Sequence, residues 1–130
     1  MSSLSDYAEK LLLDWLMTTG SATRPTAWYV GLFTAAPSDS GGGTEVSGNG
    51  YSRQTVAFGA ASSPSGTTSN SGAVTFTAAG GSWGTITHIG IFDASTSGNL
   101  LWHGAMTASK TIADGDTLEF AIGNIDLTLA

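Results

Sequence analysis

From residue 26 onward, apolar and polar residues alternate in short segments, and turns rich in Gly, Ser, Thr and Asn separate these segments. In residues 26–34, for example, Trp28, Val30 and Leu32 fall on one face of an extended strand. A strand with one apolar face must bury that face against another layer. The pattern therefore predicts an all-β fold, an antiparallel β-sandwich or jelly roll of about eight strands. The expected strands are residues 26–34, 51–58, 73–77, 83–92, 100–106, 110–112, 117–122 and 125–129.

The N-terminal segment has a different period. Its apolar residues recur every three or four positions, which predicts one amphipathic α-helix, with the stripe Leu4, Tyr7, Ala8, Leu11, Leu12, Trp15 and Leu16. Asp6 and Glu9 have the spacing of a capping box, and Gly20 supplies a stop. An isolated helix of this length is only marginally stable, so it must dock on something. Two readings are open: it covers one end of its own β-core, or it packs on a neighbouring subunit.

Length and charge limit the possible roles. The 130 residues predict a single domain spanning 1–130, with the helix in residues 1–20 and the β-sandwich in residues 26–130. Only 11% of residues are charged, so a partner can cover much of this surface at low desolvation cost. The net charge is −6, and the four basic residues are scattered. We therefore expect neither nucleic acid nor a membrane among the partners.

The sequence also predicts where the protein is made. The chain has no cysteine, so its stability does not depend on disulfides. Its N-terminal segment lacks the basic start and the uninterrupted apolar run of a signal peptide. No stretch approaches the roughly 20 apolar residues of a membrane-spanning helix. We expect a soluble protein that is assembled in the cytoplasm.

Catalytic signatures are missing from the sequence. His88 and His103 lie in expected strands without the compact ligand spacing of a metal site. No Gly-x-Ser-x-Gly elbow occurs, and the glycine run 41–43 lacks the Lys-Ser/Thr of a phosphate loop. The Asp114-Gly-Asp116 triplet fits a hairpin turn better than a calcium loop. We predict a non-enzyme with no catalytic residue, no cofactor and no metal.

Two long polar loops are the best candidates for contacts with a partner. Residues 35–50 and 59–72 are long for a compact domain, and such loops are usually functional or mobile. Glu45, with Arg53 at the start of the next strand, places charges in an otherwise neutral stretch. Such charges can fix the register with a complementary surface. We predict partner contacts at Glu45, Arg53, Asp39 and Thr44.

Several motifs together are similar to those of a known group of proteins: Trp28-Tyr-Val-Gly-Leu-Phe-Thr-Ala-Ala-Pro37, Gly42-Gly-Thr-Glu-Val-Ser-Gly-Asn-Gly-Tyr-Ser-Arg-Gln54, Ser82-Trp-Gly-Thr-Ile-Thr-His-Ile-Gly-Ile-Phe-Asp93 and Gly98-Asn-Leu-Leu-Trp-His-Gly104. The residues from 110 to 129 contribute as well. Over nearly its whole length, the chain resembles a family of small structural proteins of tailed bacteriophages and prophages. Members are often labelled tail-fibre or minor structural proteins, and some related all-β proteins are capsid cement or decoration proteins.

This resemblance implies a virion protein, and the compact β-core with long loops favours the phage head. The expected function is that of a cement or decoration protein, which bridges and stabilises major capsid subunits through several weak contacts. The expected partners are the major capsid protein and further copies of this chain, assembled in the host bacterial cytoplasm. The alternative is a tail-fibre or receptor-binding structural protein that recognises a host glycan.

Overall fold

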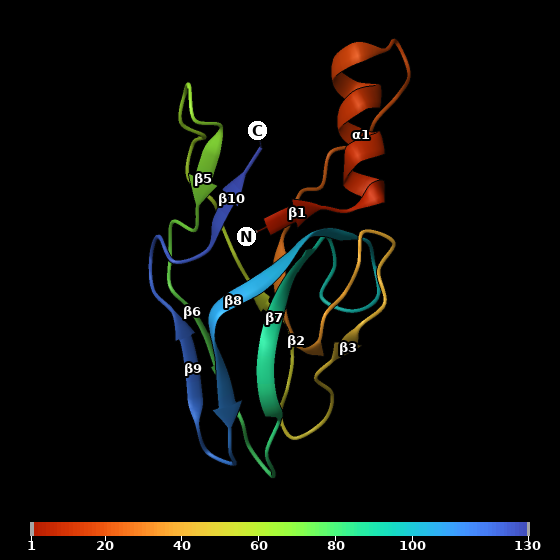
Figure 1. The fold of residues 1–130 in the computed structure, drawn as a ribbon. Helices are drawn as coiled ribbons and strands as arrows, with labels where there is room; N and C mark the ends of the chain where they lie inside the picture. The colour runs from red at the N-terminus through yellow and green to blue at the C-terminus, as the bar shows by residue number, and fades with distance from the viewer. Residues whose placement is uncertain (1, 130) are drawn as a thin grey trace.

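The computed structural model describes residues 2–129 and shows an antiparallel all-β protein with one helix (Figure 1). This confirms the predicted fold class. The elements, in chain order, are β1 (Ser2–Leu4), α1 (Asp6–Met17), β2 (Tyr29–Ala35), β3 (Thr44–Glu45), β4 (Gln54–Thr55), β5 (Thr67–Ser69), β6 (Val74–Thr77), β7 (Gly84–Phe92), β8 (Leu100–Ile112), β9 (Thr117–Phe120) and β10 (Asp126–Thr128).

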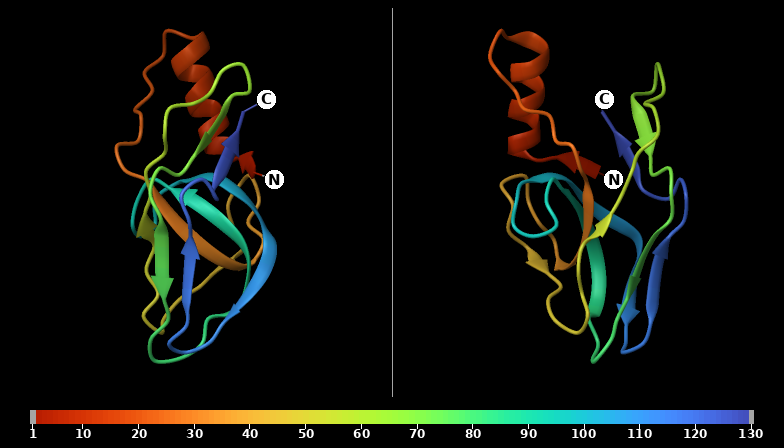
Figure 2. Two further views of the ribbon diagram at one scale, coloured as in Figure 1. Left: turned by 90° about the vertical axis from the view of Figure 1, so that its left-hand side faces the viewer. Right: turned by 180° about the vertical axis from the view of Figure 1, so that it is seen from behind.

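The strands form two layers (Figure 2). The larger layer is a six-stranded sheet with the order β1-β8-β7-β2-β3, in which β4 also pairs with β2. Two separate ribbons, β6 with β9 and β5 with β10, form the other layer. Every pairing is antiparallel. This arrangement agrees with the expected sandwich, whereas a jelly-roll connectivity is not shown.

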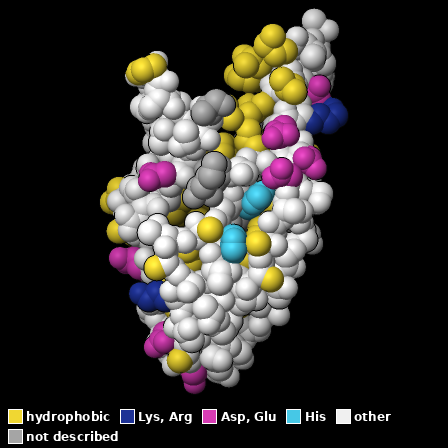
Figure 3. Space-filling view, in the orientation of Figure 1, with side chains coloured by type: hydrophobic (Ala, Val, Ile, Leu, Met, Phe, Trp, Pro, Cys, Tyr) yellow, Lys and Arg dark blue, Asp and Glu magenta, His cyan; other side chains and the backbone are white. Residues whose placement is uncertain are grey.

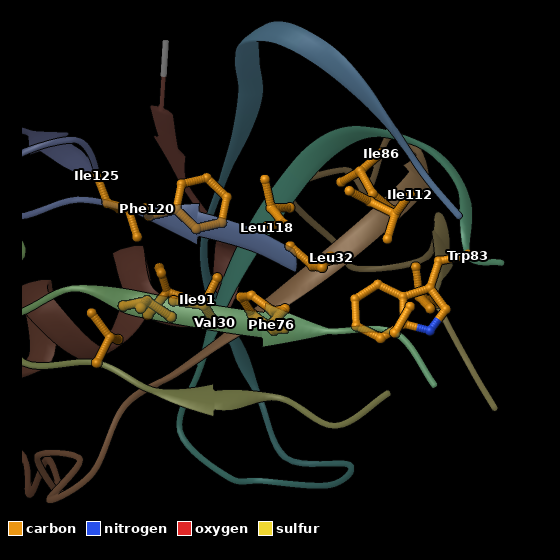
Figure 4. Packing of buried hydrophobic residues seen from close by; sticks show 14 of the residues in the cluster. Val30, Leu32, Phe76, Trp83, Ile86, Ile91, Ile112, Leu118, Phe120 and Ile125 are labelled. Carbon is orange, nitrogen blue, oxygen red and sulfur yellow. The ribbon is translucent and has the colours of Figure 1, made fainter. Parts of the chain in front are cut away.

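The main core lies between these two layers (Figure 4). Val30 and Leu32 of β2 are fully buried, as the alternation predicted. Phe76 from β6 packs edge-on against Trp83 and Phe120, so the small ribbon layer shares one aromatic cluster with the sheet. Burial of these large side chains is the main force that holds the layers together.

The opposite face of the main sheet carries a second, smaller apolar cluster of Phe33, Phe92 and Leu100. The rings of Phe33 and Phe92 stack with their centroids 6.0 Å apart. Phe33 comes from β2, the same strand that buries Val30 and Leu32 on the other face. Strand β2 is therefore covered on both faces, which explains its nearly continuous burial.

One expectation about the strands was wrong in a way that shapes the molecule. Residues 100–106 and 110–112 are not two strands but parts of the single strand β8. Its pairing with β7 shifts register between Ile86, which faces Lys110, and His88, which faces Ala105. The extra residues bulge from the ladder and bend the strand. The sequence analysis ended one strand at residue 106 and began the next at 110, but the bulge keeps both segments in one strand.

The loops are also more ordered than the sequence suggests. Strand β3 lies inside the expected loop 35–50, and β5 lies inside the expected loop 59–72. Conversely, the expected strand 51–58 shortens to β4. Ile122, at the end of the expected strand 117–122, is instead 67% exposed because β9 ends at Phe120 and a turn follows.

The start of the helix differs from the predicted capping box. Ser5, not Asp6, is the N-cap: its backbone is extended, and its hydroxyl accepts a 3.1 Å hydrogen bond from the amide of Ala8. The same hydroxyl donates to the carbonyl of Leu100. Leu4, expected in the helix stripe, lies in β1 opposite Trp102. The pairing of β1 with β8 thus decides where the helix begins.

Helix α1 contacts the two β-layers, together called the β-body, mainly through its first turn and then projects from them (Figure 1). Ala8 is its one buried residue, and the backbone amide of Asp6 donates to the carbonyl of Asp39. Trp15, Leu16 and Met17 are each more than 60% exposed. The β-body therefore covers only the start of the helix, and packing on a neighbour stays a prediction. Within residues 2–129, no helix has the length and apolar character needed to cross a membrane.

Candidate functional site

The best-organised polar cluster of the molecule forms around Glu45. Strand β3 places this residue opposite Phe33 of β2, and the next amide, that of Val46, donates to the carbonyl of Leu32. The Glu45 carboxylate lies over Gly31, where an added Cβ would be only 2.9 Å from Oε2. Gly31 therefore leaves the space that the carboxylate occupies.

Arg53 closes this cluster from the other side. Its Nε donates to Oε2 of Glu45 at 2.9 Å, and its Nη2 donates to Oε1 at 2.8 Å, so the two side chains form a bidentate pair. Its Nη1 donates to the carbonyls of Ala94 and Ser97, at 2.9 and 2.7 Å. The Arg53 side chain is only 8% exposed. The planar guanidinium matches the geometry of a carboxylate closely. Its third nitrogen also binds the turn after β7 through the carbonyls of Ala94 and Ser97.

Tyr51 connects the cluster to the core. Its hydroxyl donates to Oε2 of Glu45 at 2.6 Å and accepts from the amide of Leu32 at 3.0 Å. Its ring stacks on Phe76 and meets Trp83 edge-on. Burial, together with the hydrogen bond to the Glu45 carboxylate, raises the pKa of Tyr51 above its usual range. The hydroxyl therefore stays protonated, as a donor to Glu45 must.

The charge of Glu45 is stabilised despite its partial burial. Burial by itself would raise the pKa of this carboxyl, but the hydrogen bonds from Arg53 and Tyr51 and the positive charge of Arg53 act the other way. Together they hold the pKa of Glu45 below its ordinary value of 4.5. Glu45 and Arg53 thus form a charged pair at neutral pH that joins β3, the segment just before β4 and the turn after β7.

The four predicted contact residues do not form one site. Glu45 and Arg53 come together, and both are engaged within the chain. Thr44 is exposed next to Glu45 and pairs with Ala35. Asp39 lies elsewhere, near the start of α1, where its Oδ1 is 2.7 Å from Nε2 of His103. The structure does not test whether these residues touch a partner, so that role stays a prediction.

The sequence analysis missed the residues that complete the cluster. For Tyr51, the sequence predicted only a place in a strand. The contact of Arg53 with Phe92 was not predicted at all: the guanidinium lies 3.5 Å from the centre of the Phe92 ring, in the geometry of a cation–π contact. One signal was present: Tyr51 and Arg53 are two residues apart, so an extended backbone points both side chains to the same side. Nothing local indicated that Phe92 would lie beneath them.

A groove of about 870 Å³ runs between β8 and the ribbon layer, on the side of the molecule seen in Figure 3. Trp102, His103 and Met106 line one wall, and Leu118, Phe120 and Ile125 line the other. Both histidines are visible on this side, with acidic side chains near them (Figure 3). Among residues 2–129, however, no three His, Asp or Glu side chains gather closely enough to hold a metal ion.

The fold and this site define a small all-β protein in which the Glu45–Arg53 pair secures the protein's own strands and turns. Comparison with protein families gives the functional class. Residues 3–128 match the family described as "Podophage GP4 fiber I protein gp80", and the chain belongs to this family of phage virion structural proteins. The resemblance to phage structural proteins is thereby confirmed. A search of curated proteins found no match.

Proposed function

We propose that this protein is a non-enzymatic structural component of a phage tail fibre. The observation that carries the proposal is the family match, which spans residues 3–128 and whose description names a fibre protein. Of the two locations considered from the sequence, the tail fibre agrees better with this description than capsid cement does. The head location is kept as the competing outcome of the experiment below.

The internal hydrogen bonds of the molecule suit a module that must stay rigid under mechanical force. Glu45, Arg53 and Tyr51 connect β3, the segment just before β4 and the turn after β7 through five hydrogen bonds whose distances lie between 2.6 and 2.9 Å. Charge-assisted and bidentate bonds of this kind are stronger and more directional than neutral ones. A module fixed in this way can present its loops in one orientation to neighbouring virion proteins.

The proposed partners are other virion proteins and further copies of this chain. Low surface charge supports this part of the proposal, because weakly hydrated surfaces are covered at little cost. Asp39 and Thr44 are exposed and remain available to a partner. We also propose that the protein works by binding alone. Hydrolysis of a glycan or ester by the purified chain, lost on replacing His88 or His103, would contradict this.

Location on the particle is the direct test. Gly42 lies at an exposed turn, and an added Cβ there would meet nothing within 4 Å, so a short epitope inserted after it should not disturb the core. Gold-labelled antibodies should then decorate the fibres of intact particles. Label on the capsid shell would replace the fibre proposal with the cement reading.

Particles that lack the protein provide an independent readout. If it belongs to the fibre, these particles should adsorb poorly to cells while their heads retain DNA through heating and osmotic shock. Particles carrying the tagged protein serve as the matched control and should behave as the wild type does. Normal adsorption combined with fragile heads would support the capsid role instead.

A further inference from the structure

The end of helix α1 is apolar around its whole circumference. Of the seven residues from Leu11 to Met17, only Asp14 is polar. Seven residues make about two turns, so their side chains point in all directions from the axis. A helix that is hydrophobic all round is normally buried. Here the opposite holds, because Leu13, Trp15, Leu16 and Met17 are between 60% and 71% exposed.

The charges on this helix are either paired with each other or lie in its first turn, away from the apolar end. Lys10 is bonded to Asp14 one turn away, and the remaining acidic residues, Asp6 and Glu9, lie in the first turn. Helices that bind membrane surfaces carry several Lys and Arg residues on a polar face, and α1 has only Lys10. The surface is therefore suited to an apolar protein surface.

The size of the surface is compatible with a stable protein contact. The exposed side chains of Leu13, Trp15, Leu16 and Met17 present roughly 500 Å², taking roughly 200 Å² for each fully exposed large side chain. That lies in the upper half of the range for the largest patches on monomers, about 300–600 Å². It also approaches the roughly 800 Å² that each partner contributes to a stable complex.

We propose that the last two turns of α1 are a self-association surface, on which the α1 helices of further copies of this chain pack side by side. Predominantly apolar contacts are typical of permanent association between identical subunits. The helix also extends away from the β-body at one end of the molecule (Figures 1 and 2), so helices of different copies can meet without their bodies colliding. The inference deepens the homo-oligomeric part of the proposed function and rests on it.

The experiment compares the solution mass of three purified full-length proteins over a range of concentrations: the wild type, Leu16→Glu and Ile122→Glu. Leu16 and Ile122 are a matched pair, since their exposed fractions are 68% and 67% and Ile122 lies on the β-body. The wild type and Ile122→Glu should be oligomers, and Leu16→Glu should be monomeric. Near-ultraviolet circular dichroism should show that all three retain the β-core.

Disulfide trapping gives a second readout. Since the chain has no cysteine, Leu13→Cys introduces a single thiol on the proposed surface, and Ile122→Cys is its control. Mild oxidation should produce cross-linked dimers rapidly for Leu13→Cys and only slowly for Ile122→Cys. Equal rates for the two variants would contradict the proposal.

Three results would overturn the inference: a wild type that is monomeric at every concentration, an oligomer that survives Leu16→Glu, or a monomer whose helix binds neutral or anionic phospholipid vesicles. The last would assign the surface to a membrane. All these measurements use purified protein. Their failure is therefore distinct from a failure of the fibre assignment, which is tested on particles.

Discussion

The guanidinium carbon of Arg53 lies 3.5 Å from the centre of the Phe92 ring. Two residues that are far apart in the sequence thus make a stacked contact, and the same guanidinium binds both carboxylate oxygens of Glu45. The pair was proposed from the sequence as a contact with another protein. In the structure it also joins the chain to itself, so its substitution should affect stability first.

Replacing Arg53 with Met should destabilise the protein by about 2–4 kcal/mol. Breaking a buried ion pair costs about 3–5 kcal/mol, and the Glu45 side chain is 24% exposed, which lowers this figure. The stability of Arg53→Lys should lie between those of the wild type and Arg53→Met, because lysine keeps the positive charge but cannot bind both carboxylate oxygens as the planar guanidinium does. Urea unfolding measures these differences. The control is Arg24→Met, at an exposed position. If both variants lose equally little stability, the Glu45–Arg53 pair does not stabilise the fold.

The stability contributed by Glu45 should depend on pH. Its pKa is lowered in the folded protein, so its carboxylate stabilises the fold above the ordinary pKa of 4.5. This contribution is lost as the pH falls through the lower, folded-state pKa. The difference in unfolding free energy between the wild type and Glu45→Gln should therefore be largest near neutral pH and shrink in acid. A difference that stays constant from neutral pH into acid would rule out this linkage.

Tyr51→Phe should cost about 1–3 kcal/mol, since the amide of Leu32 loses its hydrogen-bond acceptor and Glu45 loses a donor. Tyr7→Phe, at a position 41% exposed, should be nearly neutral. In an alkaline titration followed by ultraviolet absorbance, Tyr51 should ionise well above its usual value of 10.0 while the protein stays folded. Because this pKa is raised by folding, its stabilising contribution is present below pH 10.0 and is lost as the pH rises beyond it.

Gly31→Ala should destabilise the protein by about 1–3 kcal/mol through overpacking. Its new Cβ would lie 2.9 Å from both Glu45 Oε2 and the Phe92 ring. Gly72→Ala is the matched control, since an added Cβ there meets nothing within 4 Å and its effect should stay below about 0.5 kcal/mol. Thermal unfolding of both variants measures the difference. Equal stabilities would show that the cluster can shift to make room.

Amide hydrogen exchange tests the order in the long loops. The amide of Val46 donates to the carbonyl of Leu32 at 3.0 Å, so it should be protected in the free protein. Residues 60–65 are exposed and should exchange faster, apart from Ser62, whose amide donates to the carbonyl of Thr67 at 2.8 Å. Rapid exchange at Val46 would restore the sequence-based view that the whole 35–50 loop is mobile until it meets a partner.

Local periodicity was enough to predict the elements that depend on it. Alternation placed Val30 and Leu32 on the buried face of one strand, and the 3.6-residue period predicted the helix. Both follow from the positions of neighbouring residues along the chain, so the sequence contains them directly. The same signals could not separate Ser5 from Asp6 as the N-cap, because the choice depends on β1 pairing with β8.

The candidate site depended on contacts that no local pattern records. Glu45, Arg53 and Phe92 were each visible in the sequence, yet only the pairing of β2 with β3, β4 and β7 brings them together. The continuity of β8 through its bulge was decided in the same way. Alternation thus determined which side chains face the core. Strand register and the packing of the two layers decided which side chains contact one another. Register and packing depend on the energy of the whole assembled sheet, which no local stretch of sequence records.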